Sequence, residues 1–227
     1  MAFTLVSSNE TGGGSATTTL PSLTAGNLVV VCLNNNTPSP NSAPTDTAGN
    51  TYLSVGSVQP TYNASGSAIG IWYTASCIGI GSTNTFTNPN TNPESITAMQ
   101  WSGALSSSPI DGGSGSGFSA TVNNSIGGTG TTNNLTAPNL ITNFADLVIT
   151  FSGAATGPQS AGTNIAWIPI QNVNGFSQYF IQSSAGTISP TASDGTASDP
   201  YAMVAVAFRA ASLSNIYAIP LLGAGPA

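Results

Sequence analysis

The seven acidic residues are the main candidates for catalysis, because the sequence contains no His and no Lys. Glycoside hydrolysis needs only two carboxyl groups about 5–10 Å apart, so it does not require His. Yet no two acids alternate along one expected strand, as a pair on one face of a sheet would. We interpret Asp46 and Asp111 as turn residues and predict that the protein is not an enzyme. The acids are Glu10, Asp46, Glu94, Asp111, Asp146, Asp194 and Asp199.

The near absence of positive charge excludes several classes of partner. Arg209 is the only basic residue, so the chain cannot neutralise a row of phosphates, which argues against nucleic acid and against anionic membranes. Without His there is no Ser-His-Asp triad, and without Lys there is no Schiff base and no Walker-type phosphate loop. No apolar run approaches the roughly 18–20 residues of a membrane span, so we expect no membrane insertion.

Two loops carry side chains of the kind that bind calcium, which takes oxygen ligands from Asp, Asn, Ser and backbone carbonyls. One runs from Asp46 to Asn50, and the other contains Asp194 and Asp199. Neither has the density of acids found in an EF-hand loop. Asx side chains in turns bond their own backbone, which explains both loops without a cation. We therefore predict no cofactor, with a structural calcium ion at these residues as the alternative.

Six aromatic residues could stack on sugar rings, as aromatic platforms do in carbohydrate-binding modules. They are Tyr62, Trp72, Tyr73, Trp101, Trp167 and Tyr179. The three Trp residues fall inside expected strands at the apolar phase, where burial in the core is the default for a large aromatic side chain. We expect them in the core.

Cys32 and Cys77 are the only cysteines, so the chain can form at most one disulfide. Cys32 lies within the apolar run Val29-Val-Val-Cys-Leu33, and Cys77 follows a segment with Trp72 and Tyr73. Sequence does not show whether the two meet. We expect two separate buried thiols that act as small hydrophobic side chains, with a disulfide as the alternative.

Composition favours a folded chain with an uncharged polar surface. Ser, Thr, Asn and Gly make up 108 of the 227 residues, and only 4% are charged. A disordered chain would be highly charged and poor in β-branched and aromatic runs, whereas this one is 40% hydrophobic and has discrete runs of both. The length suits one sandwich or barrel.

The pattern of short β-branched runs separated by Gly, Pro and Asn predicts an all-β antiparallel β-sandwich. We expect about ten to thirteen short strands and almost no helix, because no long window shows a clear 3.6-residue period. The continuous apolar run Leu28 to Leu33 indicates a central strand covered on both faces. The expected strands span 3–6, 16–20, 27–33, 51–58, 68–75, 83–87, 96–101, 118–122, 146–151, 164–170, 177–182 and 202–209.

We assign residues 1–211 to a single sandwich domain and residues 212–227 to an extended apolar tail. Two Gly/Ser-rich stretches, 106–117 and 123–134, could divide two domains, but each half would then have only five or six strands. The tail is uncharged, and we expect it to act as an assembly arm that adds to the sheet edge of a neighbour, with a groove on its own domain as the alternative. Its large apolar side chains are Ile216, Tyr217, Ile219, Leu221 and Leu222.

Several short segments together resemble a loosely defined group of bacterial and phage β-sandwich domains, which are jelly-roll-like and occur in secreted surface proteins and virions. In order, they are Leu20-Pro-Ser-Leu-Thr-Ala-Gly-Asn-Leu-Val-Val-Val, Thr45-Asp-Thr-Ala-Gly-Asn-Thr-Tyr52, Ile71-Trp-Tyr-Thr-Ala75, Met99-Gln-Trp-Ser-Gly103 with Ser108-Pro-Ile-Asp111, Ala145-Asp-Leu-Val-Ile149 and Tyr201-Ala-Met-Val-Ala-Val-Ala-Phe208. The resemblance covers most of residues 1–211. It implies a jelly-roll-like fold and an exposed location, and it transfers no catalytic residue.

These observations favour a non-enzymatic structural or interaction protein. We expect a subunit of a virion (a decoration, fibre or tail component) or of an extracellular filament, located in the virion or at the cell surface. Its partners would be copies of itself or other particle subunits. The start of the sequence shows no signal-peptide pattern, which agrees with release in a particle. The alternative is a carbohydrate-binding module or lectin-like adhesin.

Two behaviours follow from the scarcity of charge. With no His and few acids, stability is expected to change little between about pH 5 and about pH 9. Arg209 is the single site for trypsin, so we expect one cut there to release the tail from dissociated subunits.

Overall fold

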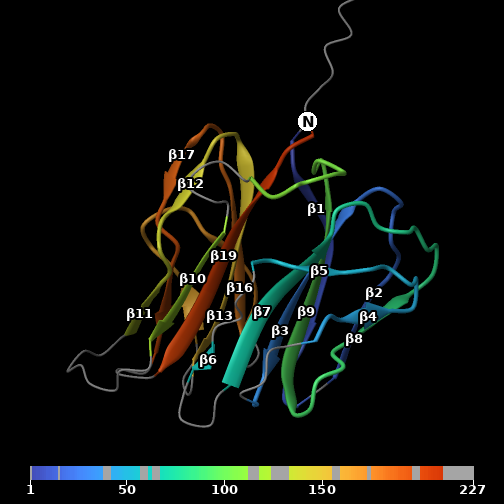
Figure 1. Cartoon of the computed structure of the whole chain (residues 1–227), viewed down its shortest axis with the longest axis horizontal. Helices are drawn as coiled ribbons and strands as arrows, with labels where there is room; N and C mark the ends of the chain where they lie inside the picture. The colour runs from blue at the N-terminus through green and yellow to red at the C-terminus, as the bar shows by residue number, and fades with distance from the viewer. Residues whose placement is uncertain are drawn as a thin grey trace, which may run out of the picture.

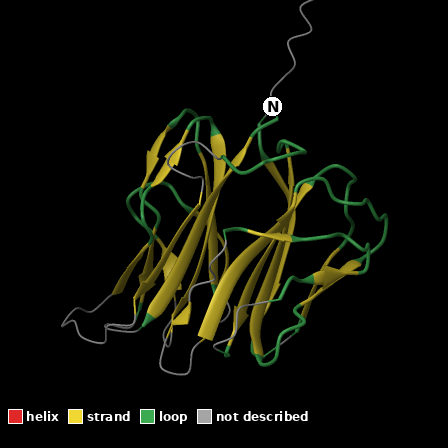
Figure 2. Cartoon of the chain, in the orientation of Figure 1, coloured by secondary structure: helices red, strands yellow, loops and turns green. Residues whose placement is uncertain are grey.

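The computed structural model describes residues 2–14, 16–37, 42–56, 61–62, 67–111, 118–123, 133–154, 159–172, 175–195 and 200–211. Within this part of the chain every regular element is a strand, and the strands pair antiparallel (Figure 2). The predicted all-β antiparallel sandwich is therefore confirmed. The described residues form nineteen strands rather than ten to thirteen, because strands of two to four residues, such as Thr45–Asp46, give no periodic signal in the sequence. The tail residues, 212–227, lie outside the described residues.

The N-terminal half folds into a large sheet and a small sheet. The large sheet has the order β1-β9-β3-β7-β5, with β6 also paired to β7, and the small sheet has the order β2-β8-β4. The strands are β1 (Thr4–Thr11), β2 (Thr17–Leu20), β3 (Leu28–Asn35), β4 (Thr45–Asp46), β5 (Leu53–Ser54), β6 (Thr61–Tyr62), β7 (Ser67–Thr74), β8 (Asn84–Thr87) and β9 (Pro93–Ser102).

The C-terminal half repeats this arrangement. Its large sheet has the order β10-β19-β13-β16-β15, its small sheet has the order β11-β18-β14, and a two-stranded sheet joins β12 to β17. The strands are β10 (Phe118–Asn123), β11 (Asn133–Thr136), β12 (Leu140–Thr142), β13 (Asp146–Ala154), β14 (Gln159–Ala161), β15 (Ile168–Asn172), β16 (Phe176–Ile181), β17 (Gly186–Ile188), β18 (Thr191–Asp194) and β19 (Tyr201–Arg209).

The two halves therefore have the same topology. In each large sheet the first strand of the half (β1 or β10) pairs with the last strand of the half (β9 or β19), and this last strand also pairs with the central strand (β3 or β13). Even the pair β12 to β17 has a counterpart, an isolated antiparallel bridge between Leu23 and Ile80. The ladder registers match as well: Leu28 of β3 lies opposite Trp101, and Leu147 of β13 lies opposite Phe208. The chain is a structural duplication, which the sequence analysis did not predict.

The two large sheets pack against each other and form the central core, as the neighbouring long strands in Figure 1 show. Buried side chains from both halves meet there, among them Val30 and Met99 from the N-terminal half and Ile149 and Val206 from the C-terminal half. Each small sheet covers the other face of its own large sheet over a separate core. The central strands are thus covered on both faces, as predicted for the run Leu28 to Leu33.

Two aromatic contacts across the central core reflect the duplication. Tyr73 meets Phe208 edge-on with ring centroids 5.6 Å apart, and Tyr179 meets Trp101 edge-on at 4.8 Å. By ladder register Tyr73 is the equivalent of Tyr179, and Trp101 is the equivalent of Phe208. The same contact therefore occurs twice with its partners exchanged, as across the two-fold axis of a symmetric dimer.

Candidate functional site

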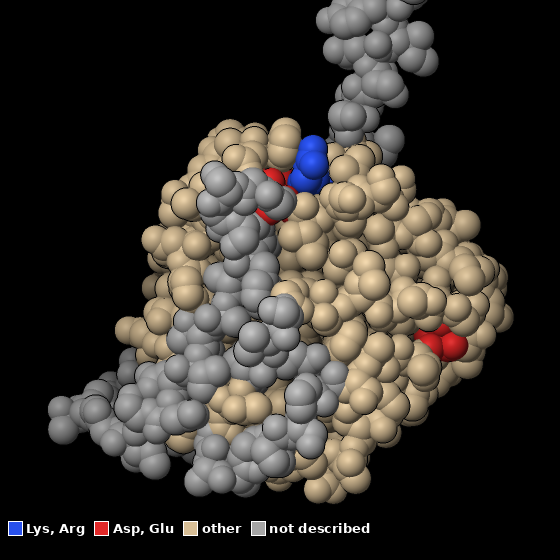
Figure 3. Space-filling model, in the orientation of Figure 1, with Lys and Arg blue, Asp and Glu red and all other residues tan. Residues whose placement is uncertain are grey.

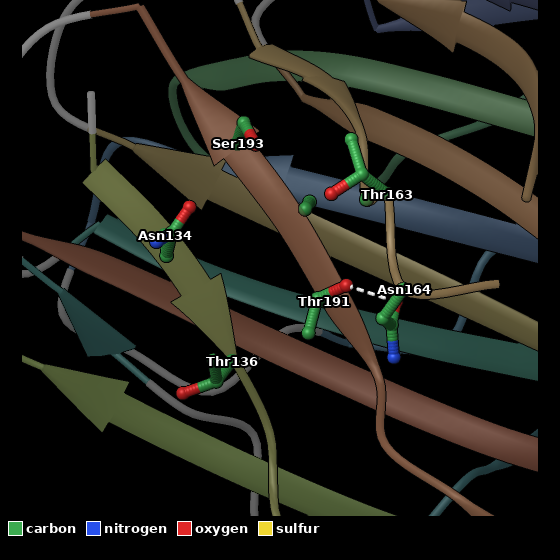
Figure 4. A pocket seen from close by; sticks show the side chains of 8 residues that line it. Asn134, Thr136, Thr163, Asn164, Thr191 and Ser193 are labelled. Atoms are coloured by element: carbon green, nitrogen blue, oxygen red, sulfur yellow. Dashed lines mark hydrogen bonds between the residues drawn. The ribbon is translucent and has the colours of Figure 1, made fainter.

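The outer face of the small sheet β11-β18-β14 carries a hollow of about 240 Å³ (Figure 4). Strand alternation places its lining, because Leu135 and Ala192 point into the core beneath while their neighbours point outward. The segment after β14 supplies the remaining wall. The polar lining residues are Asn134, Thr136, Thr163, Asn164, Thr191 and Ser193, and Gly162 and Ala192 complete it.

Asn164 is held rigidly at one side of the hollow. Its Oδ1 accepts hydrogen bonds from Trp167 Nε1 at 3.1 Å and from the hydroxyl of Thr191, and its Nδ2 donates to Ser189 O at 2.7 Å. Trp167 is itself buried, so the indole fixes the amide from below. The Thr191 to Asn164 bond is drawn in Figure 4.

The floor of the hollow is held from beneath by the buried side chain of Gln178. Its Nε2 donates to Thr191 O at 2.6 Å, and its Oε1 accepts from the backbone N–H of Gly162 at 3.2 Å. A Cβ added to Gly162 would lie 2.1 Å from Thr191 Oγ1, so only glycine allows the two segments to approach this closely.

Three side chains in the hollow have unused hydrogen-bonding capacity. Asn134, Thr163 and Ser193 make no side-chain hydrogen bond within the described part of the chain, whereas Thr136 contacts the hydroxyl of Tyr201 at 3.3 Å. The lining has amide donors and acceptors and hydroxyl groups, but no charged side chain. It can bind a neutral polar ligand through hydrogen bonds, and it contains no acid or base for proton transfer.

Asp46, predicted as a turn residue with calcium as the alternative, lies in a network of hydrogen-bond donors. Its carboxylate accepts from Asn50 N at 2.9 Å, Asn50 Nδ2 at 2.7 Å, Tyr52 Oη at 2.7 Å and Asn84 Nδ2 at 3.2 Å. Burial raises the pKa of Asp46, but these hydrogen bonds outweigh it, so the pKa lies below its usual value. Donors therefore stabilise both oxygens, and a cation would have to displace them.

The second predicted calcium loop lies only partly within the described residues. Asp194 is the last residue of β18, is fully buried and lies opposite Asn133 and Gln159 in the ladders. Asp199 lies outside the described residues. Within those residues there is also no group of three or more Cys, Asp or Glu side chains placed to hold a metal ion.

The structure does bring two other acids together, Asp111 and Asp146. Asp111 accepts hydrogen bonds from the backbone N–H and the side-chain amide of Asn143, the latter at 3.0 Å. Burial raises the pKa of Asp146 to about 7, and the neighbouring Asp111 adds to the rise, whereas the charge of Arg209 lowers it. Arg209 lies opposite Asp146 in the ladder and over the ring of Phe144, 4.2 Å from its centroid.

Sequence reasoning missed this acid pair because it compared acids along single strands. Asp111 follows the N-terminal half, and Asp146 opens β13; they meet because both segments flank the end of β19. The one available signal was that both acids lie in segments that carry the resemblance. Both are almost completely buried, so a substrate cannot reach them.

The Trp side chains lie in the cores, as the sequence analysis expected. Trp72, Trp101 and Trp167 are all buried, although Trp167 precedes β15 rather than lying within it. Of the three Tyr residues proposed for sugar stacking, Tyr62 and Tyr73 are buried and Tyr179 packs on Trp101.

Cys32 and Cys77 are both free and buried, so the expectation of two separate thiols is confirmed. They lie in different cores, because Cys32 points between the large sheets and Cys77 points toward the small sheet β2-β8-β4. Burial raises the pKa of both thiols.

The scan against protein-family models found no match, and the searches of curated proteins and of solved structures found none either. Among the described residues there is no helix with the length and apolarity needed to cross a membrane.

Proposed function

We propose that the protein is a non-enzymatic structural or interaction protein, a subunit of a virion or of an extracellular filament. The duplicated architecture is the observation that carries this proposal. Each half arranges at least eight strands in two packed sheets, and the halves join back to back. Eight-stranded double sheets of the jelly-roll type are common in viral capsid and lectin domains, so the observed strand order supports the predicted jelly-roll-like fold and this class of function.

The distribution of charge supports close association between copies. Three of the seven acids in the sequence, Asp111, Asp146 and Asp194, are buried, so the surface carries fewer acidic groups than the sequence contains. The described residues on the face in Figure 3 are mostly uncharged, with a few acidic atoms and one small basic area. Weak long-range repulsion allows identical subunits to approach, and hydroxyl and amide groups can form hydrogen bonds across the contact.

The edges of the large sheets are the surfaces on which assembly would act. β1 forms one edge of the N-terminal large sheet, and its Val6 side chain is 47% exposed at an irregular point in the ladder. At the edge of the C-terminal large sheet, Pro169 of β15 lacks a backbone donor, which hinders the addition of a strand there. We therefore infer that, of these two edges, the tail of a neighbour would add to β1 rather than to β15.

The test is the assembly state of three chains: the full chain, a chain ending at Ala211, and the full chain with Val6→Pro. Mass is measured by light scattering over a range of concentrations. We expect the full chain to form a defined assembly and both altered chains to remain monomeric, because one lacks the arm and the other blocks its edge. Circular dichroism checks that both still fold. A full chain that stays monomeric, and is absent from purified particles, would contradict the proposal.

Deletion is a better test of the tail than trypsin. Arg209 lies within β19; its N–H donates to Pro109 O at 2.7 Å, and its carbonyl accepts from Leu105 N at 2.9 Å. A protease needs an extended, unpaired segment, so the fold itself protects this bond in subunits as well as in assemblies. We therefore expect trypsin to cut poorly at Arg209 in dissociated subunits too, in contrast to the prediction from sequence.

A further inference from the structure

We propose that the hollow on β11-β18-β14 binds a neutral glycan, through the side chains of Asn134, Thr163 and Ser193. This inference goes beyond the proposed function, because a particle subunit need not bind a carbohydrate. It also moves the glycan site away from the aromatic residues, which the fold uses in its cores.

The chemistry of the lining selects the class of ligand. No charged side chain borders the hollow, so an anionic or cationic ligand would lose hydration without gaining a countercharge. Ala192 is the one hydrophobic residue in the lining, and its methyl group points into the core beneath, so a hydrophobic ligand would gain little. Hydroxyl and amide groups complement the hydroxyl groups of a neutral sugar, which both donate and accept hydrogen bonds.

The size of the hollow agrees with a sugar ring. Its volume of about 240 Å³ leaves room for several water molecules. A bound sugar would replace this water with one rigid ligand. Since the hollow opens to solvent on the face of a sheet, a longer chain could pass through it with neighbouring sugar units extending on either side.

The rigid parts of the hollow reduce the entropy lost on binding. Asn164 is fixed by Trp167, Ser189 and Thr191, and Gln178 fixes the backbone of Gly162 and Thr191. The groups left for a ligand project from this framework rather than from a mobile loop. Pre-organised polar groups of this kind bind more tightly than groups that must be ordered at the moment of binding.

The duplication provides a matched control. Asn134 of β11 lies opposite Ser193 of β18, and both side chains point outward. In the other half, β2 and β8 take the places of β11 and β18, and their outward side chains Thr19 and Thr85 lie opposite each other. Both pairs lie on the outer face of a small sheet, at exposed or half-buried positions. The double variant Asn134→Ala/Ser193→Ala removes ligand groups, and Thr19→Ala/Thr85→Ala makes the same kind of change in the other half.

The test uses isotopically labelled full chain titrated with neutral hexasaccharides of glucose, mannose and xylose and, separately, with oligogalacturonate and a heparin fragment. Amide chemical shifts report where each one binds. We expect at least one neutral series to shift the amides of residues 134–136, 162–164 and 191–193, and the charged probes to shift none of them. Losing two hydrogen bonds should weaken binding by about tenfold or more in the Asn134/Ser193 variant and leave the Thr19/Thr85 variant unchanged.

Each other outcome overturns the proposal. These outcomes are no shift with any neutral probe at millimolar concentration, shifts confined to other residues, equal binding of the charged probes, or unchanged affinity in the Asn134/Ser193 variant. The side chains of Asn134 and Ser193 are not buried and have no partner among the described residues, so the Asn134/Ser193 variant should keep the unfolding temperature of the native chain. A second variant, Ser193→Trp, fills the hollow from its rim and gives an independent check that the neutral probe binds there.

Discussion

Asp146 should make the stability of the protein depend on pH, in contrast to the flat profile expected from composition. In the folded chain burial and the neighbouring Asp111 raise its pKa to about 7, whereas its ordinary value is 3.8. Between these values the folded chain holds a proton that the unfolded chain has released. Stability is therefore greatest at the acidic side of this window and falls as the pH rises through it.

The size of the effect follows from the proton linkage. From about pH 5 to the folded pKa of about 7, the free energy of unfolding falls by roughly 1.4 kcal/mol for each pH unit, or by about 3 kcal/mol in all. Above the folded pKa both states are deprotonated at this site and the curve becomes flat. For a chain of this length about 1 kcal/mol corresponds to roughly 2–4 °C, so the unfolding midpoint should fall by about 6–12 °C.

The assay is thermal unfolding followed by circular dichroism in a series of buffers of equal ionic strength, for the native chain and for Asp146→Asn. The amide has nearly the shape of the carboxyl group and cannot ionise, so the slope should disappear in the variant. Asp46→Asn is the control, because the pKa of Asp46 is depressed and its contribution is lost only in more acidic buffers.

A flat native curve between about pH 5 and about pH 9 would refute this reasoning, because it would mean that Asp146 has an ordinary pKa or is deprotonated without loss. A slope that persists unchanged in Asp146→Asn would refute it differently, by assigning the titration to another group. The neighbours that set the effect are Asp111, which raises the pKa, and Arg209, which opposes the rise.

Three further predictions test the packing. Trypsin should leave the native chain intact and cut it once, at Arg209, only when urea unfolds it; rapid cleavage of the native chain would mean that the end of β19 opens readily. Cys32 and Cys77 should not react with a thiol reagent until the chain unfolds, when both should react, and native reactivity at Cys32 would contradict its place between the large sheets. Gly153→Ala should lower stability by about 1–3 kcal/mol in urea unfolding, because its Cβ would lie 2.7 Å from the ring of Tyr62, and a neutral effect would show that the ring can move aside.

The sequence predicted the long strands well because burial on both faces leaves a strong pattern. β3 and β19 are continuous apolar runs, as expected for strands covered on both sides. β9 was found from its apolar residues, of which Ile96 and Ala98 face one core and Met99 and Trp101 face the other. The missed strands, such as β14 and β17, have only three residues, too few for a period to appear. Tertiary pairing rather than local preference forms them.

The duplication was not visible in the sequence because an interior position requires only an apolar side chain of suitable volume. Trp101 and Phe208 occupy equivalent ladder positions, and so do Met99 and Val206, yet neither pair is identical. Two chains of the same topology can therefore share almost no residues. The acid pair and the hollow were missed for a related reason, because both join segments that are distant in the sequence and depend on the completed fold.

The two halves differ where the fold constrains them little. The central core needs both large sheets and repeats the same aromatic contact on either side of its pseudo-two-fold axis. Among the described residues, the central core between the halves contains none from the small sheets, so the outer faces of these sheets are free to differ. One presents a row of threonines, Thr17, Thr87 and Thr45, across three strands, and the other presents amides and hydroxyls around a hollow. If one half has acquired a ligand site, an outer face of this kind is where it could arise without loss of stability.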